Sequence, residues 1–333
     1  MALIRIAKRS IVTAAAALLF TAGPIFGQTV VAPPQPPAVP LRAPRPQIGN
    51  FERSIAVDPN VSIKMPCVSG GNVAVNGWSR NEVRVLVEQG SPFEIKVQQR
   101  SENGSPVWIL IGSAENASGP DARCLRGRID IDAPFGSFFD LTGRRAATVV
   151  ESVKKAKVTN LEGNITMRNI KGGLVAATYQ GDISVENSSG EIALESSTGN
   201  VFAFQVQPGE PGDLFRAKTT NGTISLQNVE HRQIDAGSIS GSVLFDGRLL
   251  SGGLYRFKTS NGALRLTLPA DSSGRIIATY GFGSFNSQIP VKTVTENITD
   301  AAKIVQGEIG SGDSTVTVNL STTTGNIMIT KKN

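Results

Sequence analysis

Few residues in this sequence are of a type that could do chemistry. The chain of 333 residues has one histidine, His231, and two cysteines, Cys67 and Cys124. A structural zinc site of four cysteines, or of two cysteines and two histidines, cannot be assembled from this set. His231 lies in Glu230-His231-Arg232, a polar segment between expected strands. We therefore predict a surface histidine here rather than a general base.

Paired carboxylates are the other chemistry to consider, because glycan hydrolases hold two of them roughly 5–10 Å apart. Asp130 and Asp132 alternate along an expected strand, near Asp140. Same-face neighbours on a strand lie about 7 Å apart, which keeps a cation or catalytic pair open as an alternative. Four other acids recur at equivalent repeat positions and are interpreted as solvated charges or turn caps: Asp182, Glu186, Glu191 and Glu195.

Known catalytic and ligand-binding motifs do not match. Calcium-binding nonapeptides need Gly-Gly-x-Gly-x-Asp, whereas no aspartate recurs at a constant place here. The Gly281-Phe282-Gly283 segment precedes no expected helix, so it is not a phosphate loop. No Gly-x-Ser-x-Gly elbow occurs on a strand-to-helix turn. The sequence therefore predicts no enzyme, with no catalytic, cofactor-binding or metal residue and no cofactor.

The elements that would position any site are set by a glycine repeat. Five glycines lie nine residues apart, and the second and fourth residues after each are apolar. The alternate residues are mostly polar, which is typical of short half-buried strands. The glycines are Gly163, Gly172, Gly181, Gly190 and Gly199.

The same pattern continues at looser spacing after Gly222, Gly241, Gly262 and Gly325, with a poorer copy at Gly283. Half-steps of nine and steps of about 20 indicate coils made of two short strands and two turns. The predicted fold is therefore all-β, a parallel β-helix or solenoid built from short Gly-turn repeats. An antiparallel sandwich is the competing architecture, because it also has many short strands with turn signals.

Three features resemble the putative adhesin family of exported bacterial proteins, a family of unknown function with β-solenoid domains. They are the opening segment 70–85, the ladder of Thr/Ser/Asn-x-Gly-x-Ile/Val steps, and the strand-then-proline segments 129–134 and 266–270. The similarity spans about residues 51–330. It implies a solenoid fold and an envelope location, and it brings no catalytic residue.

The amino-terminal residues predict export. Residues 1–27 have basic residues followed by an apolar run of 12, Ile11–Ala22, which is typical of a secretory signal peptide. An uncleaved anchor is the alternative, although this run is short for a membrane span. Residues 28–50 contain seven prolines and are predicted to be an extended linker. The solenoid would then occupy residues 51–330, with possible sub-blocks 51–135 and 136–330, and no membrane span would remain after signal cleavage.

Charge and cysteine content complete the expectations. The formal charge of +6 falls to +3 when residues 1–27 are removed, too little to indicate nucleic-acid binding. In an oxidising compartment Cys67 and Cys124 are candidates for one disulfide, with two buried thiols as the alternative. We expect a non-catalytic scaffold of the periplasm or cell surface whose repetitive β-faces bind envelope polymers or proteins. An accessory role in envelope-stress sensing, and a glycan lyase or hydrolase, are the alternatives.

Overall fold

The computed structural model describes residues 48–114, 123–298, 302–310 and 315–332. All of them belong to one compact unit, Arg45–Asn333. The predicted signal peptide, residues 1–27, and most of the predicted linker lie outside the described residues. The first strand, β1 (Gly49–Ala56), begins within the last two residues of that linker. No helix in the described part of the chain has the length and apolar character to cross a membrane.

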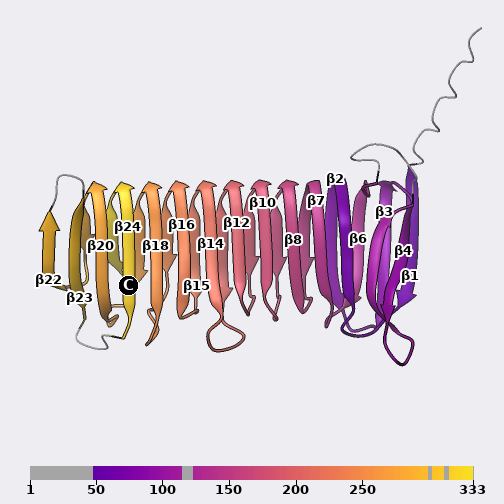
Figure 1. Ribbon diagram of the computed structural model, residues 1–333, viewed down its shortest axis with the longest axis horizontal. Coiled ribbons are helices and arrows are strands. Elements are labelled where there is room, and N and C mark those ends of the chain that lie inside the picture. Colours follow the sequence, from indigo (N-terminus) through magenta and orange to yellow (C-terminus); the bar gives the residue numbers. More distant parts are fainter. Residues whose placement is uncertain (1–47, 115–122, 299–301, 311–314, 333) are drawn as a thin grey trace, which may run out of the picture. The chain divides into compact units, whose positions relative to one another are not determined.

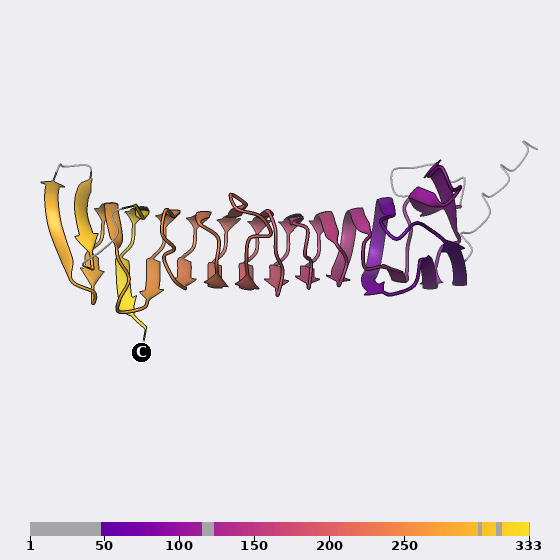
Figure 2. The ribbon, with the colours of Figure 1, turned by 90° about the horizontal axis from the view of Figure 1, so that it is seen from below.

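The described chain is all-β, and its central coils each contribute one strand to two rows (Figures 1 and 2). One row, called here the long-strand face, consists in spatial order of β8 (Lys155–Glu162), β10 (Leu174–Gln180), β12 (Ile192–Thr198), β14 (Leu214–Asn221), β16 (Gln233–Ser240), β18 (Leu254–Asn261), β24 (Thr317–Thr324) and β20 (Gly274–Phe282). The other, the short-strand face, consists of β9 (Ile165–Arg168), β11 (Ile183–Glu186), β13 (Val201–Val206), β15 (Ile224–Val229), β17 (Val243–Asp246), β19 (Leu264–Leu268), β25 (Ile327–Lys331) and β21 (Phe285–Ser287).

Neighbouring strands within each face are parallel. In β10, Leu174 pairs with Ala156 on one side and Ile192 on the other, so β8, β10 and β12 follow one another in steps of 18 residues. The nine-residue glycine spacing is therefore half a coil, so successive glycines fall on opposite corners and every second one stacks on the same corner, as Gly181 does on Gly163. The parallel β-solenoid that the glycine repeat predicts is confirmed.

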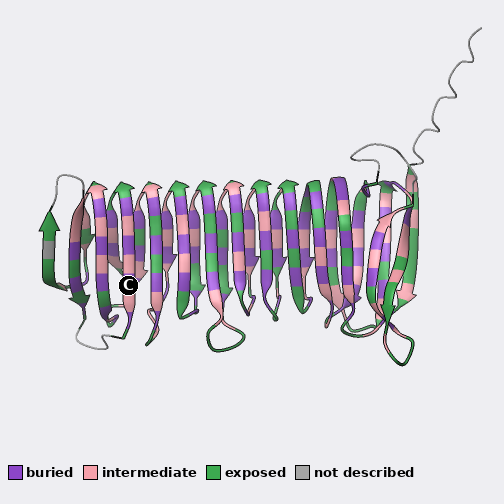
Figure 3. Ribbon diagram, in the orientation of Figure 1, coloured by how far each residue is buried: buried purple, intermediate pink, exposed green. Residues whose placement is uncertain are grey.

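Buried and more exposed residues alternate along the strands (Figure 3), because every second side chain points between the two faces. Ile183, Ile192 and Ile224 are fully buried, as the apolar ladder predicts. Buried aromatic residues widen the core farther along the stack, where the rings of Phe245 and Phe257 lie 5.2 Å apart. One coil cannot bury its inward residues alone, so each coil is stabilised by its neighbours.

One corner of the stack is built on glycine. Gly199 has φ +151°, and a Cβ there would overlap the carbonyl oxygen of Gly181 in the coil below. A buried hydroxyl three residues before each such glycine satisfies a carbonyl of the preceding coil; Ser196 Oγ donates to Gly181 O over 2.9 Å. The residues that repeat this bond are Thr178, Ser196, Thr219, Ser238, Thr259 and Thr322.

The ends of the stack depart from a purely parallel solenoid. Two long strands, β2 (Ser62–Trp78) and β7 (Phe138–Glu151), are parallel to each other and run through both faces. Antiparallel pairs join β1, β3 (Glu82–Gly90) and β6 (Arg128–Pro134), and likewise β4 (Phe93–Arg100) and β5 (Pro106–Ser113). At the other end, β23 (Lys303–Ile309) pairs antiparallel with β20, and β22 (Val291–Ile298) pairs antiparallel with β23, so that both extend the long-strand face.

Chain order and spatial order differ at the carboxyl end. The coil of β24 and β25 lies between the coil of β18 and β19 and the coil of β20 and β21 (Figure 1). Gly325 accordingly stacks between Gly262 and Gly283 rather than beyond Gly283. The last coil of the chain therefore fills a gap between two earlier ones.

Candidate functional site

The aspartates that a catalytic pair would need are engaged with arginines. Asp130 and Asp132 do lie on the same face of β6. Asp132 Oδ2 accepts hydrogen bonds from Arg84 Nε at 2.9 Å and Nη2 at 2.5 Å, and this bond and charge raise the pKa of Arg84. Asp130 Oδ2 accepts from Arg128 Nε at 3.1 Å. The pair is therefore neutralised by two guanidinium groups.

The remaining candidate acids are not brought together. Asp140 pairs in register with Lys64 of β2, whereas Asp130 pairs with Ala74, which lies farther along the same strand. Glu186 lies on the short-strand face, where Arg168 donates to it at 3.3 Å, and Glu195 lies on the long-strand face. Within the described ranges, no group of three or more Asp, Glu, His or Cys residues could hold a metal ion.

Asp182 caps a turn, as its position after a glycine predicts. Its Oδ1 accepts a hydrogen bond from the backbone nitrogen of Asn200 at 2.7 Å. Its own backbone nitrogen donates to Asn164 Oδ1 at 2.9 Å, so the caps form a ladder along the glycine corner. Glu191 is exposed. The side chain of Asp182 therefore has a structural role in the turn.

The prediction of a surface His231 is wrong. The ring is fully buried, 5.6 Å from the ring of Phe215, and its Nε2 donates to the carbonyl oxygen of Gly190 at 2.9 Å. Burial lowers the pKa of His231, so the neutral form is favoured. Glu230 and Arg232 are exposed, and these polar neighbours suggested an exposed histidine. The side chain of His231 between them points into the core instead.

Cys67 and Cys124 are joined by a disulfide in the structure, with their Cα atoms 4.6 Å apart. The adjoining residues are also bonded, because Leu125 N donates to Cys67 O at 3.0 Å and Ser69 N donates to Leu125 O at 2.8 Å. That this bond exists in the exported protein stays a prediction. Mass mapping without reduction should recover one cross-linked peptide pair, and two free thiols would contradict it.

A groove follows the corner opposite the glycine ladder, where each strand of the short-strand face ends. Near the ends of β7, β9, β11, β13 and β15, one residue adopts a left-handed conformation without being glycine, with φ between 48° and 59°. These residues stack coil upon coil; Asn169 N donates to Glu186 O and Asn187 N donates to Phe204 O, both at 3.1 Å. They are Ser152, Asn169, Asn187, Gln205 and Asn228. We call this surface the corner groove.

Asparagine suits such a corner because its short polar side chain tolerates the left-handed region. Asn187, Gln205 and Asn228 are exposed, and Ser152 and Asn169 are half-buried. Residues held in sparsely populated backbone regions gather at functional sites. The column therefore presents amide groups to solvent on three successive coils, at Asn187, Gln205 and Asn228.

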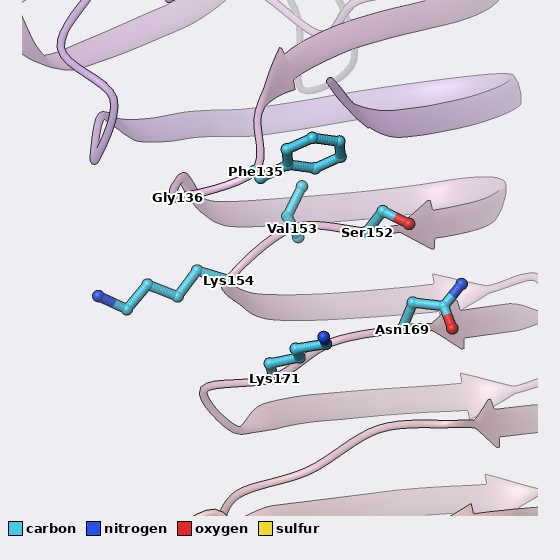
Figure 4. Close-up of a pocket in the computed structure, with 7 residues that line it drawn as sticks. All are labelled: Phe135, Gly136, Ser152, Val153, Lys154, Asn169 and Lys171. Atoms are coloured by element: carbon cyan, nitrogen blue, oxygen red, sulfur yellow. The ribbon is translucent and has the colours of Figure 1, made fainter. Parts of the chain in front are cut away.

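Three hollows succeed one another along this corner. The first, of about 670 Å³, is lined by Phe135, Gly136, Ser152, Val153, Lys154, Asn169 and Lys171 (Figure 4). The second, of about 400 Å³, begins at Asn187 in the next coil and reaches Glu230. The third, of about 370 Å³, shares Asn228 and Glu230 with the second and extends to Pro269 and Lys332.

The length of the corner groove decides what it can bind. From Ser152 to Pro269 it crosses seven coils, which at a strand spacing of 4.7–4.9 Å is about 30 Å. Side-chain amides offer both donors and acceptors, matched to a ligand rich in hydroxyl groups. The arrangement is suited to holding an extended polymer and has no paired carboxylates at its floor.

The left-handed residues of the corner groove were not predicted from the sequence. The signal that could have found them is a polar residue between a strand's last outward residue and the next apolar one. It recurs in Arg168-Asn169-Ile170, Phe204-Gln205-Val206 and Gln227-Asn228-Val229. The alternating apolar residues predict the strands, whereas the residues of the corner groove lie at the ends of those strands.

Comparison with known proteins gives limited similarities. Among curated proteins none matches the chain. A putative adhesin from Parabacteroides distasonis ATCC 8503 is 12% identical with a TM-score of 0.39, over 66% of this chain and 90% of that chain. A putative cell adhesion protein from Clostridium sporogenes ATCC 15579 is 12% identical with a TM-score of 0.24, over 85% of this chain and 100% of that chain.

The sequence-family comparison is decisive. The family model described as Toastrack DUF4097 matches residues 152–330, which covers nearly all of the regular coils and the corner groove apart from Phe135, Gly136 and Lys332. The match confirms the resemblance to an uncharacterised β-solenoid family. Because it spans more than half of the 333 residues, this chain belongs to the Toastrack DUF4097 family.

Proposed function

We propose that this chain is a non-catalytic, exported protein of the cell envelope that binds an extended glycan along the corner groove. The observation that carries the proposal is the succession of three hollows along one corner, each lined by at least one residue of the same left-handed column. A repeated fold offers the same contacts at every coil, as a repeated polymer requires.

The side chains favour a glycan over a protein or a nucleic acid. Stable protein interfaces rely on clustered aromatic and apolar anchors, whereas the second hollow is lined mainly by Asn187, Gln205, Gln207 and Asn228. The described lining of the second hollow contains no basic residue that could neutralise a phosphate backbone. Hydroxyl groups, by contrast, can both donate to and accept from amides.

Several features support a binding role rather than a catalytic one. Asp130 and Asp132 are held by arginines, and the histidine is buried without access to the groove residues named above. Export, with the periplasm or cell surface as the location, is supported by the basic and apolar segments of residues 1–27. The proposed partners are therefore polymers of the envelope, and the chain would present them along its length.

Calorimetry with oligosaccharides of increasing length tests the proposal on the purified exported protein. Affinity should rise with the number of sugar units until the corner groove is filled. The double variant Asn187→Gly and Asn228→Gly keeps the left-handed backbone and removes two amides, so it should weaken binding by about tenfold.

The double variant Ser184→Ala and Ser225→Ala changes the outward surface of the short-strand face and serves as the control. Its affinity should match that of the unchanged protein. Equal affinity for a single sugar and a long oligosaccharide, or an unaffected asparagine variant, would contradict binding along the groove.

A further inference from the structure

The first hollow differs from the rest of the corner groove in charge and in apolar surface. It combines two lysines, Lys154 and Lys171, with the ring of Phe135 (Figure 4). It is also the largest of the three hollows, at about 670 Å³. The other two hollows are lined by no aromatic residue.

The two lysines occupy equivalent places on successive coils. Each is the third residue after a strand of the corner ends, β7 at Glu151 and β9 at Arg168. The backbones are adjacent, because Gly172 N donates to Lys154 O at 2.6 Å. Both side chains are exposed, and in the described part of the chain neither ammonium group has an acidic partner within 4 Å.

The two lysine side chains point in different directions in the structure, and the ammonium group of Lys154 is directed away from Lys171 (Figure 4). The nearest acid by sequence, Glu151, accepts a hydrogen bond from Asn169 Nδ2 at 3.3 Å. Lysine side chains are long and flexible, so both can turn toward a ligand anion between them and donate charge-assisted hydrogen bonds to it.

Phe135 supplies a flat apolar surface beside these charges. Its side chain is 54% exposed, at the turn between β6 and β7, although large aromatic residues usually bury most of their surface. The turn is confined, because a Cβ at Gly136 would lie 2.5 Å from Pro59 O. A sugar ring packed on Phe135 would remove this apolar surface from water.

We propose that the first hollow binds an anionic sugar unit of an acidic polysaccharide. Its carboxylate would lie between Lys154 and Lys171, its ring would pack on Phe135, and its hydroxyls would bond to Ser152 and Asn169. The inference rests on the proposed function, and it assigns the charge of the polymer and the end of the groove that recognises it.

The test compares polygalacturonate oligosaccharides with their carboxyl-reduced, neutral counterparts of the same length, by calorimetry on the exported protein at low salt. Charge-assisted hydrogen bonds to both lysines should make the acidic form bind about tenfold to a hundredfold more tightly. The double variant Lys154→Gln and Lys171→Gln should abolish this preference by lowering the affinity for the acidic form to that for the neutral form. Phe135→Ala should weaken binding of both forms.

Lys157→Gln is the matched control, because Lys157 is exposed on the long-strand face of the same coil, outside the hollow. It should keep the preference for the acidic form, and melting curves should show that every variant is folded. Equal binding of the two forms, or a loss with Lys157→Gln as large as with the lysine pair, would overturn the inference and leave glycan binding standing. Binding of neither form would contradict the proposed function itself.

Discussion

At the scale of the residue, His231 makes the free energy of unfolding depend on pH. It is the single histidine of the sequence, so no other histidine contributes to this dependence. The unfolded chain takes up a proton near the ordinary value of 6.5, whereas burial lowers the pKa of His231 in the folded protein. The unfolded state therefore binds more protons as pH falls below about 6.5, and the free energy of unfolding decreases.

We expect urea melts to lose up to about 1.4 kcal/mol per pH unit below that point. His231→Phe should remove the slope between about pH 5 and 7, whatever it does to stability itself. A slope that persists in the variant would assign the effect to another group.

The two sides of a strand should differ sharply in their tolerance of truncation. Ile183 and Ile192 are fully buried, so replacing either with Ala should cost about 2–5 kcal/mol of unfolding free energy. Glu195→Ala and Glu186→Ala should stay within about 0.5 kcal/mol, because exposed ion pairs such as Arg168 with Glu186 contribute little. Chemical denaturation measures both, and a reversed order would mean that the register is shifted by one residue.

Residues inside the strands were predictable from sequence, whereas those at the corners were not. A period of two reports which side of a strand a residue occupies, and Ile183 and Ile224 follow it. His231 and Asn228 lie where the chain turns, and there the period breaks. The environments of His231 and Asn228 depend on neighbouring coils, to which Phe215 and Gln205 belong. They do not depend on the residues adjacent in sequence.

At the scale of the element, the inserted coil of β24 and β25 should be the weak point of the stack. Gly325 has φ +148°, and a Cβ there would overlap the carbonyl oxygen of Gly262. Gly325→Ala should therefore open this coil and expose the strands that it joins. Hydrogen exchange should quicken in β20, β21, β24 and β25 and stay slow in β10 to β15, because each coil depends on its nearest neighbours.

Gly237→Ala is the matched control, since its new methyl group would lie 3.6 Å from the nearest atom, Lys258 O. Its exchange pattern should match that of the unchanged protein. Uniform exchange across the whole stack of the Gly325 variant would mean that the coils unfold together.

The strands were predictable from sequence, but the order of the last coils was not. The glycine steps near 21 residues fit a stack in chain order as well as the observed insertion, because spacing carries no information about which coil lies next to which. The antiparallel strands β22 and β23 were likewise hidden, since they follow no glycine of the ladder. They carry the chain beyond β20, and it then returns to pair β24 with β18.

At the scale of the whole molecule, repetition fits the proposed role of binding without catalysis. The corner groove extends over about 30 Å and holds amides on four successive coils, from Asn169 to Asn228, which suits a polymer of equivalent units. Catalysis needs unlike groups gathered at one point, such as an acid and a base with different pKa values. The described carboxylates are instead distributed over the stack, and the likeliest pair is neutralised by Arg84 and Arg128.

The purified protein should accordingly release no product from pectic, peptidoglycan or exopolysaccharide substrates, with or without calcium. The pair most able to contradict this is Asp130 with Asp132, since the two share a face of β6. Reducing-end and unsaturated-sugar assays would detect hydrolase and lyase turnover, respectively. Turnover that disappears in both Asp130→Asn and Asp132→Asn, with circular dichroism unchanged, would overturn the binding role. Binding without turnover is the expected result, because Oδ2 of Asp132 and Oδ2 of Asp130 already accept hydrogen bonds from Arg84 and Arg128, whereas general acid–base catalysis needs a carboxyl group that can bond to the substrate.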